Sequence, residues 1–431
     1  MAQAADRLSA FDLTSLAVEA ADTPMHVAVV AVLDGRTLLD DAGDPRMSEI
    51  QDRLRDGVAA APRLRQMIRR RPLGRARWSG DPAFRIERHV SAVVLEPPGG
   101  EAELLRAAER LLAAPLPRTR PLWRLWVVTG LPDRRLALIV ALHHAIGDGV
   151  AVMRLIDALL DPARRDWDPV SGRDRPARSL AAVWRTIRQV RGAPRTTLNA
   201  PVGPGRRLGV THLDLAAAKA VAHAAGGKVN DVVVSVAAGG LRALLAARGE
   251  RTDGVELRVA VAASLRGPDE RGNAGNHNGS FLVPVPLQGT DAEHRLRAIA
   301  AATARAKREQ APVAQQHCMV LAARTGLARR ISRHQHMVNL AESNLPGPPA
   351  PIHALGAPVL HLLPVGAIAG NMTVSFLALS YAGDLVITAI ADRARVPDLP
   401  VLLDGMRREW RRLHPAGHPP AGLQHAKERG S

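Results

Sequence analysis

Cysteine is almost absent from this chain of 431 residues. Its one cysteine, Cys318, allows no disulfide within the chain and no thiolate cluster for zinc, which favours a reducing compartment. The first residues lack the basic start and apolar run of a secretory signal, so we expect an intracellular protein. A long stretch without formal charge, residues 349–383, is interrupted by prolines and glycines, and we expect buried strands and turns there, not a membrane span.

Aromatic side chains are also scarce, at 3% of the residues, although hydrophobic residues make up 46%. Leucine, valine, alanine and isoleucine must therefore build the core, and the length predicts two domains. Lysine is rare too, so arginine carries almost all of the net charge of +17. Arginine suits phosphate, carboxylate or anionic lipid headgroups, but a solvated surface shaped by coding bias is an equally good interpretation of this composition.

Several familiar sites are missing. The chain has no G-x-S-x-G elbow, no Walker loop and no H-E-x-x-H motif, which argues against hydrolase, NTPase and zinc peptidase functions. The most basic stretch, residues 63–78, holds one aromatic residue and no helix-turn-helix or finger spacing, so we do not expect a nucleic-acid partner. His317, His334 and His336 lack a nearby acidic ligand, and surface histidines are a better interpretation than a metal site.

Hydrophobic periodicity predicts a mixture of strands and helices without strict alternation, and hence an α/β fold with mixed sheets. Strands are expected at residues 25–35, 121–128, 135–142, 256–264, 359–364, 373–381 and 385–392. Helices are expected at residues 47–60, 101–114, 149–160, 215–225, 228–249, 291–310 and 399–413. Residues 162–209 are rich in arginine, proline and glycine and form the best linker candidate, with a possible short helix at 180–190.

Residues 136–149, "LALIVALHHAIGDG", place two histidines at the end of an apolar strand. Successive side chains of a strand face opposite ways, so only one of His143 and His144 can face a given cavity. A neutral imidazole there could take a proton from an alcohol. Asp148 would hold the loop through an arginine or backbone donors, and Gly149 would let a substrate approach the main chain. A core histidine beside a helix-capping aspartate explains these residues equally well.

The wider stretch "PLWRLWVVTGLPDRRLALIVALHHAIGDGVA" resembles the catalytic region of the bacterial wax ester synthase/diacylglycerol acyltransferase family, within the chloramphenicol acetyltransferase and condensation-domain superfamily. "RLSAFD…PMHVAVVAVL", "VNDVVVSVAAGGLRALL", "NLAESNLPGPP" and "LSYAGDLVITAIADRARVPD" are similar to its other blocks. The resemblance implies two chloramphenicol-acetyltransferase-like domains with an active-site tunnel at their interface. We expect an N-terminal domain over residues 1–165, a linker over 166–208 and a C-terminal domain over 209–431.

By that resemblance His144 is the general base, and His143, Asp148 and Gly149 complete the catalytic motif. A fatty alcohol or diacylglycerol hydroxyl attacks the thioester of acyl-CoA directly, without a covalent acyl-enzyme. The superfamily pairs the motif aspartate with an arginine from the other half of the chain, and Arg266 is the candidate partner.

The later blocks carry further expectations from the resemblance. Asn230 and Asp231 match an Asn-Asp block, with an expected structural role at the domain interface. Ser343 or Asn344 could donate a hydrogen bond to the oxyanion or line the tunnel. Arg124 stands where the family pattern "PLWE" has an acidic residue, which puts the local pairing there in doubt.

The expected reaction needs no cofactor or metal, since acyl-CoA is a substrate. An arginine-rich surface would meet the phosphates of CoA and an anionic membrane or lipid-droplet face, so we expect a cytoplasmic protein with peripheral lipid contact. Two alternatives stay open. One is a related acyltransferase with a different hydroxyl acceptor, and the other is a catalytically silent lipid-binding relative. The oligomeric state cannot be read from the sequence.

Overall fold

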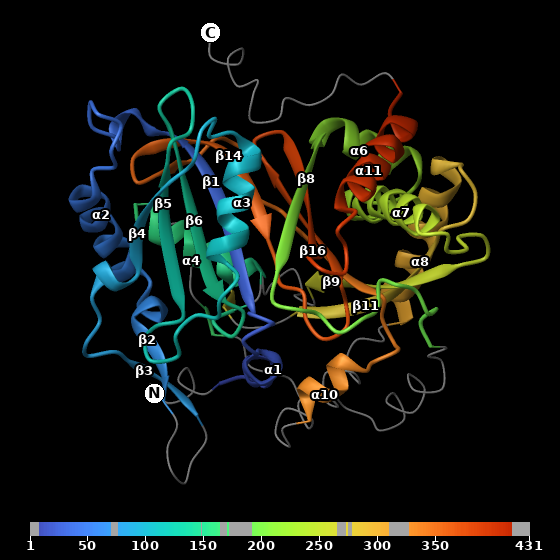
Figure 1. The fold of residues 1–431 in the computed structure, drawn as a ribbon, viewed down its shortest axis with the longest axis horizontal. Coiled ribbons are helices and arrows are strands. Elements are labelled where there is room, and N and C mark those ends of the chain that lie inside the picture. The colour runs from blue at the N-terminus through green and yellow to red at the C-terminus, as the bar shows by residue number, and fades with distance from the viewer. Residues whose placement is uncertain are drawn as a thin grey trace. The chain divides into compact units, whose positions relative to one another are not determined.

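The chain forms two compact units (Figure 1). The computed structural model describes residues 8–69, 76–147, 149–163, 170–171, 192–264, 273–274, 278–309 and 327–415. The first unit comprises Met1–Arg175, Leu265–His277 and Pro351–Val365, and the second comprises Pro176–Ser264, Asn278–Ala350 and Gly366–Ser431. The division is therefore not one of consecutive halves, because residues 351–365 return to the first unit.

A six-stranded mixed sheet forms the centre of the first unit, in the order β13-β14-β1-β6-β5-β4. The strands are β1 (His26–Asp34), β4 (Val90–Val94), β5 (Trp123–Thr129), β6 (Arg135–His143), β13 (His353–Ala354) and β14 (Ala357–Val365). β6 pairs with β1 and β5 antiparallel, whereas β4 pairs with β5 in parallel. Every residue of β6 is buried, as expected of a strand in the middle of a sheet that is covered on both faces.

The described residues of this unit form four α-helices: α1 (Ala10–Val18), α2 (Met47–Ala60), α3 (Glu101–Leu111) and α4 (Gly149–Leu160). In Figure 1, α3 lies in front of the sheet and α4 behind it. Gly57 of α2 allows close contact with α4, because a Cβ atom there would lie 2.1 Å from the carbonyl oxygen of Leu159. Short elements complete the unit: η1 (Gly35–Thr37), η2 (Pro62–Arg65), β2 (Gln66–Arg69), β3 (Arg77–Gly80), η3 (Ile86–Arg88), β7 (Val170–Ser171) and β10 (Asn273–Ala274).

The second unit has its own six-stranded mixed sheet, in the order β11-β9-β12-β15-β16-β8. The strands are β8 (Arg206–Asp214), β9 (Glu256–Ser264), β11 (Asn278–Pro286), β12 (Leu340–Leu345), β15 (Val374–Tyr381) and β16 (Asp384–Asp392). β12 runs parallel to both of its neighbours, β9 and β15, and the other pairs are antiparallel. β12 is therefore the strand that makes this sheet mixed.

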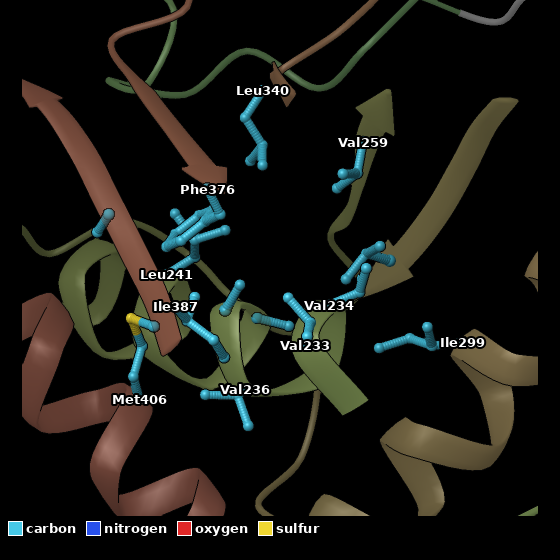
Figure 2. Close-up of a cluster of buried hydrophobic side chains, with 14 of the residues drawn as sticks. Val233, Val234, Val236, Leu241, Val259, Ile299, Leu340, Phe376, Ile387 and Met406 are labelled. Carbon is cyan, nitrogen blue, oxygen red and sulfur yellow. The ribbon is translucent and has the colours of Figure 1, made fainter. Parts of the chain in front are cut away.

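Among its described residues, the second unit has the helices α6 (Leu215–Ala224), α7 (Val229–Ala247), α8 (Ala292–Glu309), α10 (Ala328–Arg333) and α11 (Leu399–Leu413). Figure 2 shows α7 side chains such as Val233 and Leu241 packed among Val259, Phe376 and Ile387 of the sheet. α7 is long and apolar enough to cross a membrane, with a mean hydropathy of 1.5 over its most apolar window, and 72% of that window is buried inside the unit.

Most elements expected from the sequence are present. The strand at residues 25–35 and the helix at 47–60 are β1 and α2, and the uncharged stretch 349–383 contains β13, β14 and β15. The predicted linker over 166–208 overlaps the start of β8 at Arg206, and the domain boundaries stay a prediction. The possible helix at 180–190 lies outside the described residues.

A buried ion pair joins α8 to α11 in the second unit. Arg295 Nη1 lies 3.0 Å from Glu409 Oε1, and the two side chains are 1% and 2% exposed. Arg295 also donates to the carbonyl oxygen of Gly289. Burial lowers the pKa of the Arg295 guanidinium and raises the pKa of the Glu409 carboxyl, so each charge depends on the other. Neither group can be removed alone without leaving an uncompensated charge in the interior.

The first prediction concerns this pair. Glu409→Leu leaves Arg295 buried and unpaired, and we expect a loss of about 3–5 kcal/mol in the free energy of unfolding, measured by denaturant titration. Adding Arg295→Met should restore most of that loss. The matched control is Glu293→Gln, which breaks an exposed pair with Arg297 on the same helix and should change stability by less than about 0.5 kcal/mol. A single-variant loss as small as the control would contradict the prediction.

Candidate functional site

The histidine doublet lies at the end of β6. His143 is the last residue of the strand, opposite His26 of β1, and its main-chain N–H donates to the carbonyl oxygen of Leu122 at 2.9 Å. His144 follows in the turn, and its main-chain N–H donates to the carbonyl oxygen of Met25 at 2.8 Å. The doublet is thus fixed on one side by the segment that begins β1 and on the other by the segment that begins β5.

The ring of His143 is fully buried, and a polar group of the protein lies next to each of its nitrogens. Nδ1 accepts a hydrogen bond from the main-chain N–H of Ala145 at 2.9 Å. The ring proton therefore lies on Nε2, which is 3.1 Å from Glu19 Oε1. The ring is not exposed, and a protein group lies next to each of its nitrogens, so His143 is a structural residue of the turn.

Glu19, which sequence reasoning missed, is the partner that completes this arrangement. It follows α1 and is almost fully buried, and its Oε2 accepts from Arg118 at 2.9 Å while Oε1 accepts from the main-chain N–H of Met25 at 3.3 Å. Burial alone would raise the pKa of this carboxyl, but the hydrogen bonds from His143, Arg118 and Met25 lower it to about 2. Glu19 is therefore a fixed negative charge beside the doublet at all ordinary pH values.

His144 differs from His143 in its surroundings, because its side chain is half-buried where that of His143 is sealed. The turn that carries it closes through a hydrogen bond from the N–H of Ile146 to the carbonyl oxygen of His143. Gly147 is required for this path, because a Cβ atom there would lie 2.7 Å from the Cβ of Ala151. Gly149 begins α4, as expected from the sequence, and Asp148 lies outside the described residues.

The "PLW" segment before β5 supports the same strand end. Trp123 donates from Nε1 to the carbonyl oxygen of Leu64 at 2.8 Å and stacks on His89, with ring centroids 4.5 Å apart. Burial lowers the pKa of His89 to about 4, so this ring is uncharged at neutral pH. Arg124, which replaces the acidic residue of the family pattern, donates to Ser91 Oγ at 3.3 Å and lies over the ring of Trp126.

In the second unit, Asn230 and Asp231 lie in the first turn of α7. The carboxylate of Asp231 accepts from the main-chain N–H of Lys228 at 2.7 Å, which caps the helix. Asn230 Nδ2 donates to Glu342 Oε2 at 3.4 Å. These two contacts support the start of α7. The expected place of this Asn-Asp block at an interface between domains stays a prediction.

Glu342 of β12 is a second residue that sequence reasoning missed. It is 2% exposed, and burial raises the pKa of its carboxyl to about 8, with the neighbouring charge of Asp231 adding to the shift. Leu340 and Glu342 face the helices of this unit, so alternation along the strand turns Ser343 to the opposite face of the sheet and Asn344 back to the helix side. Ser343 and Asn344 therefore do not point into the same space.

The geometry tests neither the predicted partner of Asp148 nor all three of the histidines considered as metal ligands. Arg266, the candidate partner of Asp148, lies outside the described residues, as does His317. His334 and His336 follow α10, and the described part of the chain holds no group of three histidine, cysteine, aspartate or glutamate side chains placed to bind a metal.

Comparison with solved structures defines the class of fold. The first condensation domain of the calcium-dependent antibiotic synthetase matches with a TM-score of 0.67 at 16% identity, covering 97% of this chain and 98% of that one. The starter condensation domain of rhizomide synthetase matches with a TM-score of 0.62 at 14% identity, covering 95% and 93%. These likenesses confirm the predicted fold of two chloramphenicol-acetyltransferase-like units with mixed sheets.

A more specific match comes from the sequence. The profile of the wax ester synthase/diacylglycerol acyltransferase catalytic domain matches residues 8–192 and 173–233, and that of the WS/DGAT C-terminal domain matches residues 274–414. The chain therefore belongs to the wax ester synthase/diacylglycerol acyltransferase family, and the predicted enzyme class, an acyltransferase, is confirmed.

Individual relatives agree with the family match. The wax ester synthase/diacylglycerol acyltransferase from Marinobacter aquaeolei VT8 has a TM-score of 0.71 at 26% identity, covering 94% of this chain and 98% of that one. The probable diacylglycerol O-acyltransferase tgs1 of Mycobacterium tuberculosis is 29% identical over 449 residues, covering 95% of this chain and 96% of the relative. The probable diacylglycerol O-acyltransferase tgs2 of the same species is 28% identical, covering 94% and 98%.

The second prediction follows from the raised pKa of Glu342. Between about pH 4.5 and pH 8 the folded chain keeps a proton that the unfolded chain releases, so this residue makes stability fall as pH rises through that window. We expect Glu342→Gln to remove the dependence, giving a stability advantage over the parent that grows from pH 5 to pH 8 and reaches a few kcal/mol. Thermal unfolding across this pH range measures it.

The control is again Glu293→Gln, an exposed glutamate in the same unit, which should track the parent at every pH. A difference between Glu342→Gln and the parent that stays constant from pH 5 to pH 8 would show that the carboxyl is not protonated in the folded chain.

Proposed function

We propose that this acyltransferase moves a fatty acyl group from acyl-CoA to the hydroxyl of diacylglycerol or of a long-chain alcohol, with His144 as the general base. The observation that supports His144 is the difference between the two rings of the doublet. His143 is sealed, with Nδ1 hydrogen-bonded to the N–H of Ala145 and Nε2 3.1 Å from Glu19 Oε1, whereas His144 is half-buried at the next position. A ring with both nitrogens occupied cannot accept a substrate proton, so the second histidine is the better base.

The reaction needs only the two substrates. As the hydroxyl oxygen attacks the thioester carbonyl, His144 takes the hydroxyl proton, and a tetrahedral adduct forms. The carbon–sulfur bond then breaks, the imidazolium returns the proton to the departing CoA sulfur, and the ester remains. No acyl-enzyme, metal or cofactor enters this sequence. The expected roles of Asp148 and Arg266 in holding the loop, and of Gly149 in letting the substrate approach the main chain, fit the same scheme.

The choice of acceptor rests on the relatives. The two Mycobacterium tuberculosis relatives are named as diacylglycerol O-acyltransferases, and the Marinobacter relative is named for both wax ester and diacylglycerol activities. We therefore propose that one or both of these acceptors serve this chain. The nucleophile is an alcohol in either case, so the same base performs the same proton transfer.

The third prediction tests the base. His144→Ala should lower the rate of thiol release from palmitoyl-CoA by about 10²–10⁴-fold with dioleoylglycerol and with hexadecanol, because proton removal from the alcohol loses its catalyst. His336→Ala, a change at an exposed histidine outside the doublet, should keep the parental rate. Full turnover by a folded His144→Ala protein would remove the proposed base. A parent that acylates neither alcohol would point to another acceptor or to a silent relative.

We also propose a peripheral contact with anionic membrane or lipid-droplet surfaces. The net charge of +17 supports it, as does a surface at α10 that we call the α10 patch: exposed Leu327 and Ile331, which lie four residues apart, with exposed Arg329 and Arg330. Exposed apolar side chains next to arginines are the composition of interfacial lipid-binding segments.

The fourth prediction concerns the α10 patch. The double variant Leu327→Ser/Ile331→Ser should reduce binding to vesicles that contain anionic lipid by about tenfold, measured by cosedimentation, because apolar burial is lost. Binding by the parent should weaken as salt rises, since screening removes the charge attraction. Val94→Ser, at an exposed valine of the first unit, is the control and should bind like the parent. Equal binding by the double variant would exclude the α10 patch as the contact.

A further inference from the structure

Glu19 connects four separate segments of the first unit. It follows α1, and its carboxylate contacts Met25 at the start of β1, Arg118 in the segment before β5, and His143 at the end of β6. Met25 in turn accepts the main-chain N–H of His144 through its carbonyl oxygen. The main chain of Met25 therefore bonds to both residues: its N–H donates to Glu19, and its carbonyl oxygen accepts from His144, the proposed base.

The two oxygens of the carboxylate have separate partners. Oε1 lies against the histidine doublet, within reach of His143 Nε2 and the N–H of Met25, while Oε2 accepts from the Arg118 guanidinium. The Glu19 side chain is 3% exposed, but that of Arg118 is 44% exposed. The negative charge is thus held in the interior next to the doublet, and its positive partner is partly exposed to solvent, where water partly screens it.

This asymmetry distinguishes Glu19 from a carboxylate that serves packing alone. A buried charge acts at short range on nearby groups that titrate. The imidazole that Glu19 contacts is that of His143, and His144 is the next residue in the chain. Among the described residues, His26 lies directly opposite His143 on β1, and Arg124 of β5 lies opposite Ala141, two residues before His143 on β6. Neither of them carries a fixed negative charge.

We propose that Glu19 is a positioning residue for the acyl transfer. It orients His143 and, through His143, the turn that carries His144. Its negative charge also stabilises the protonated form of His144 that arises during the reaction. Orientation sets the direction in which the base meets the hydroxyl, and the charge stabilises the imidazolium that forms when the proton arrives. This proposal rests on the proposed function, since it assumes that His144 is the base.

The proposal predicts opposite effects for two neighbouring substitutions, which is the fifth prediction. Glu19→Gln keeps an acceptor for His143 but removes the negative charge, so the acid limb of the kcat/KM profile should move to lower pH by roughly one unit. Arg118→Gln leaves Glu19 without its compensating cation, so the same limb should move to higher pH. A carboxylate with a purely structural role would move the limb in neither direction, or in the same direction for both variants.

The size of the rate effect separates orientation from folding. Glu19→Gln should lower kcat by about 10-fold and Glu19→Ala by about 100-fold, with KM for palmitoyl-CoA changed less than about twofold, because the misplaced group acts on chemistry and not on binding. The control is Glu87→Gln, which removes an exposed carboxylate paired with Arg55 in the same unit and should leave kcat and the pH profile unchanged. If Glu19→Ala fails to fold, the two glutamine variants carry the test.

A second measurement does not depend on turnover. Diethyl pyrocarbonate modifies uncharged imidazoles, so peptide mapping of His144 modification against pH reports its titration in the parent, Glu19→Gln and Arg118→Gln. The midpoint should fall in Glu19→Gln and rise in Arg118→Gln. If the parent turns over neither alcohol, the proposed function fails, while this order of midpoints still decides the role of Glu19. Unmoved midpoints, or midpoints that move together, would overturn the proposal.

Discussion

A fully buried imidazole must have both of its ring nitrogens satisfied, and this constraint governs the structure around the doublet. His143 ends a strand that is buried along its whole length, so water cannot supply the missing partner. One nitrogen is satisfied locally, by the N–H of Ala145 two residues ahead, which fixes the turn. The other must be met by a group from elsewhere in the chain, and that requirement brings Glu19 into the interior.

A carboxylate in the interior is costly unless donors surround it, and besides His143 the donors here come from two further places. Arg118 lies 99 residues from Glu19 in the sequence, and Met25 contributes a main-chain N–H at the point where β1 begins. The helix α1, the first strand and the segment before β5 are therefore tied together at the end of β6. The half-buried position of His144 is a product of this network, because its main-chain N–H is bound to Met25.

Local signals in the sequence predict what depends on neighbouring residues. The periodicity and turn residues of β1, α2, α4 and α11 lie within their own segments, and each was predicted within a few residues. The doublet was found because its two histidines are adjacent.

Glu19 was missed because it follows an ordinary amphipathic helix and meets His143 only after folding. The return of β14 to pair with β1 was missed for the same reason, since no local pattern specifies a partner strand. β8 (Arg206–Asp214) was missed, because its first residues belong to a segment rich in arginine, proline and glycine.

The two buried glutamates missed by sequence reasoning show that surroundings, not residue type, set the charge of a carboxyl. Glu19 has three donors, one of them a guanidinium, and its pKa falls to about 2. Glu342 has an amide donor and lies near the carboxylate of Asp231, and burial raises its pKa to about 8. At neutral pH the first is a fixed negative charge and the second is mostly neutral. The first unit therefore uses its buried carboxyl to orient and polarise the histidine doublet, whereas the second unit uses its own to close the packing beneath the first turn of α7.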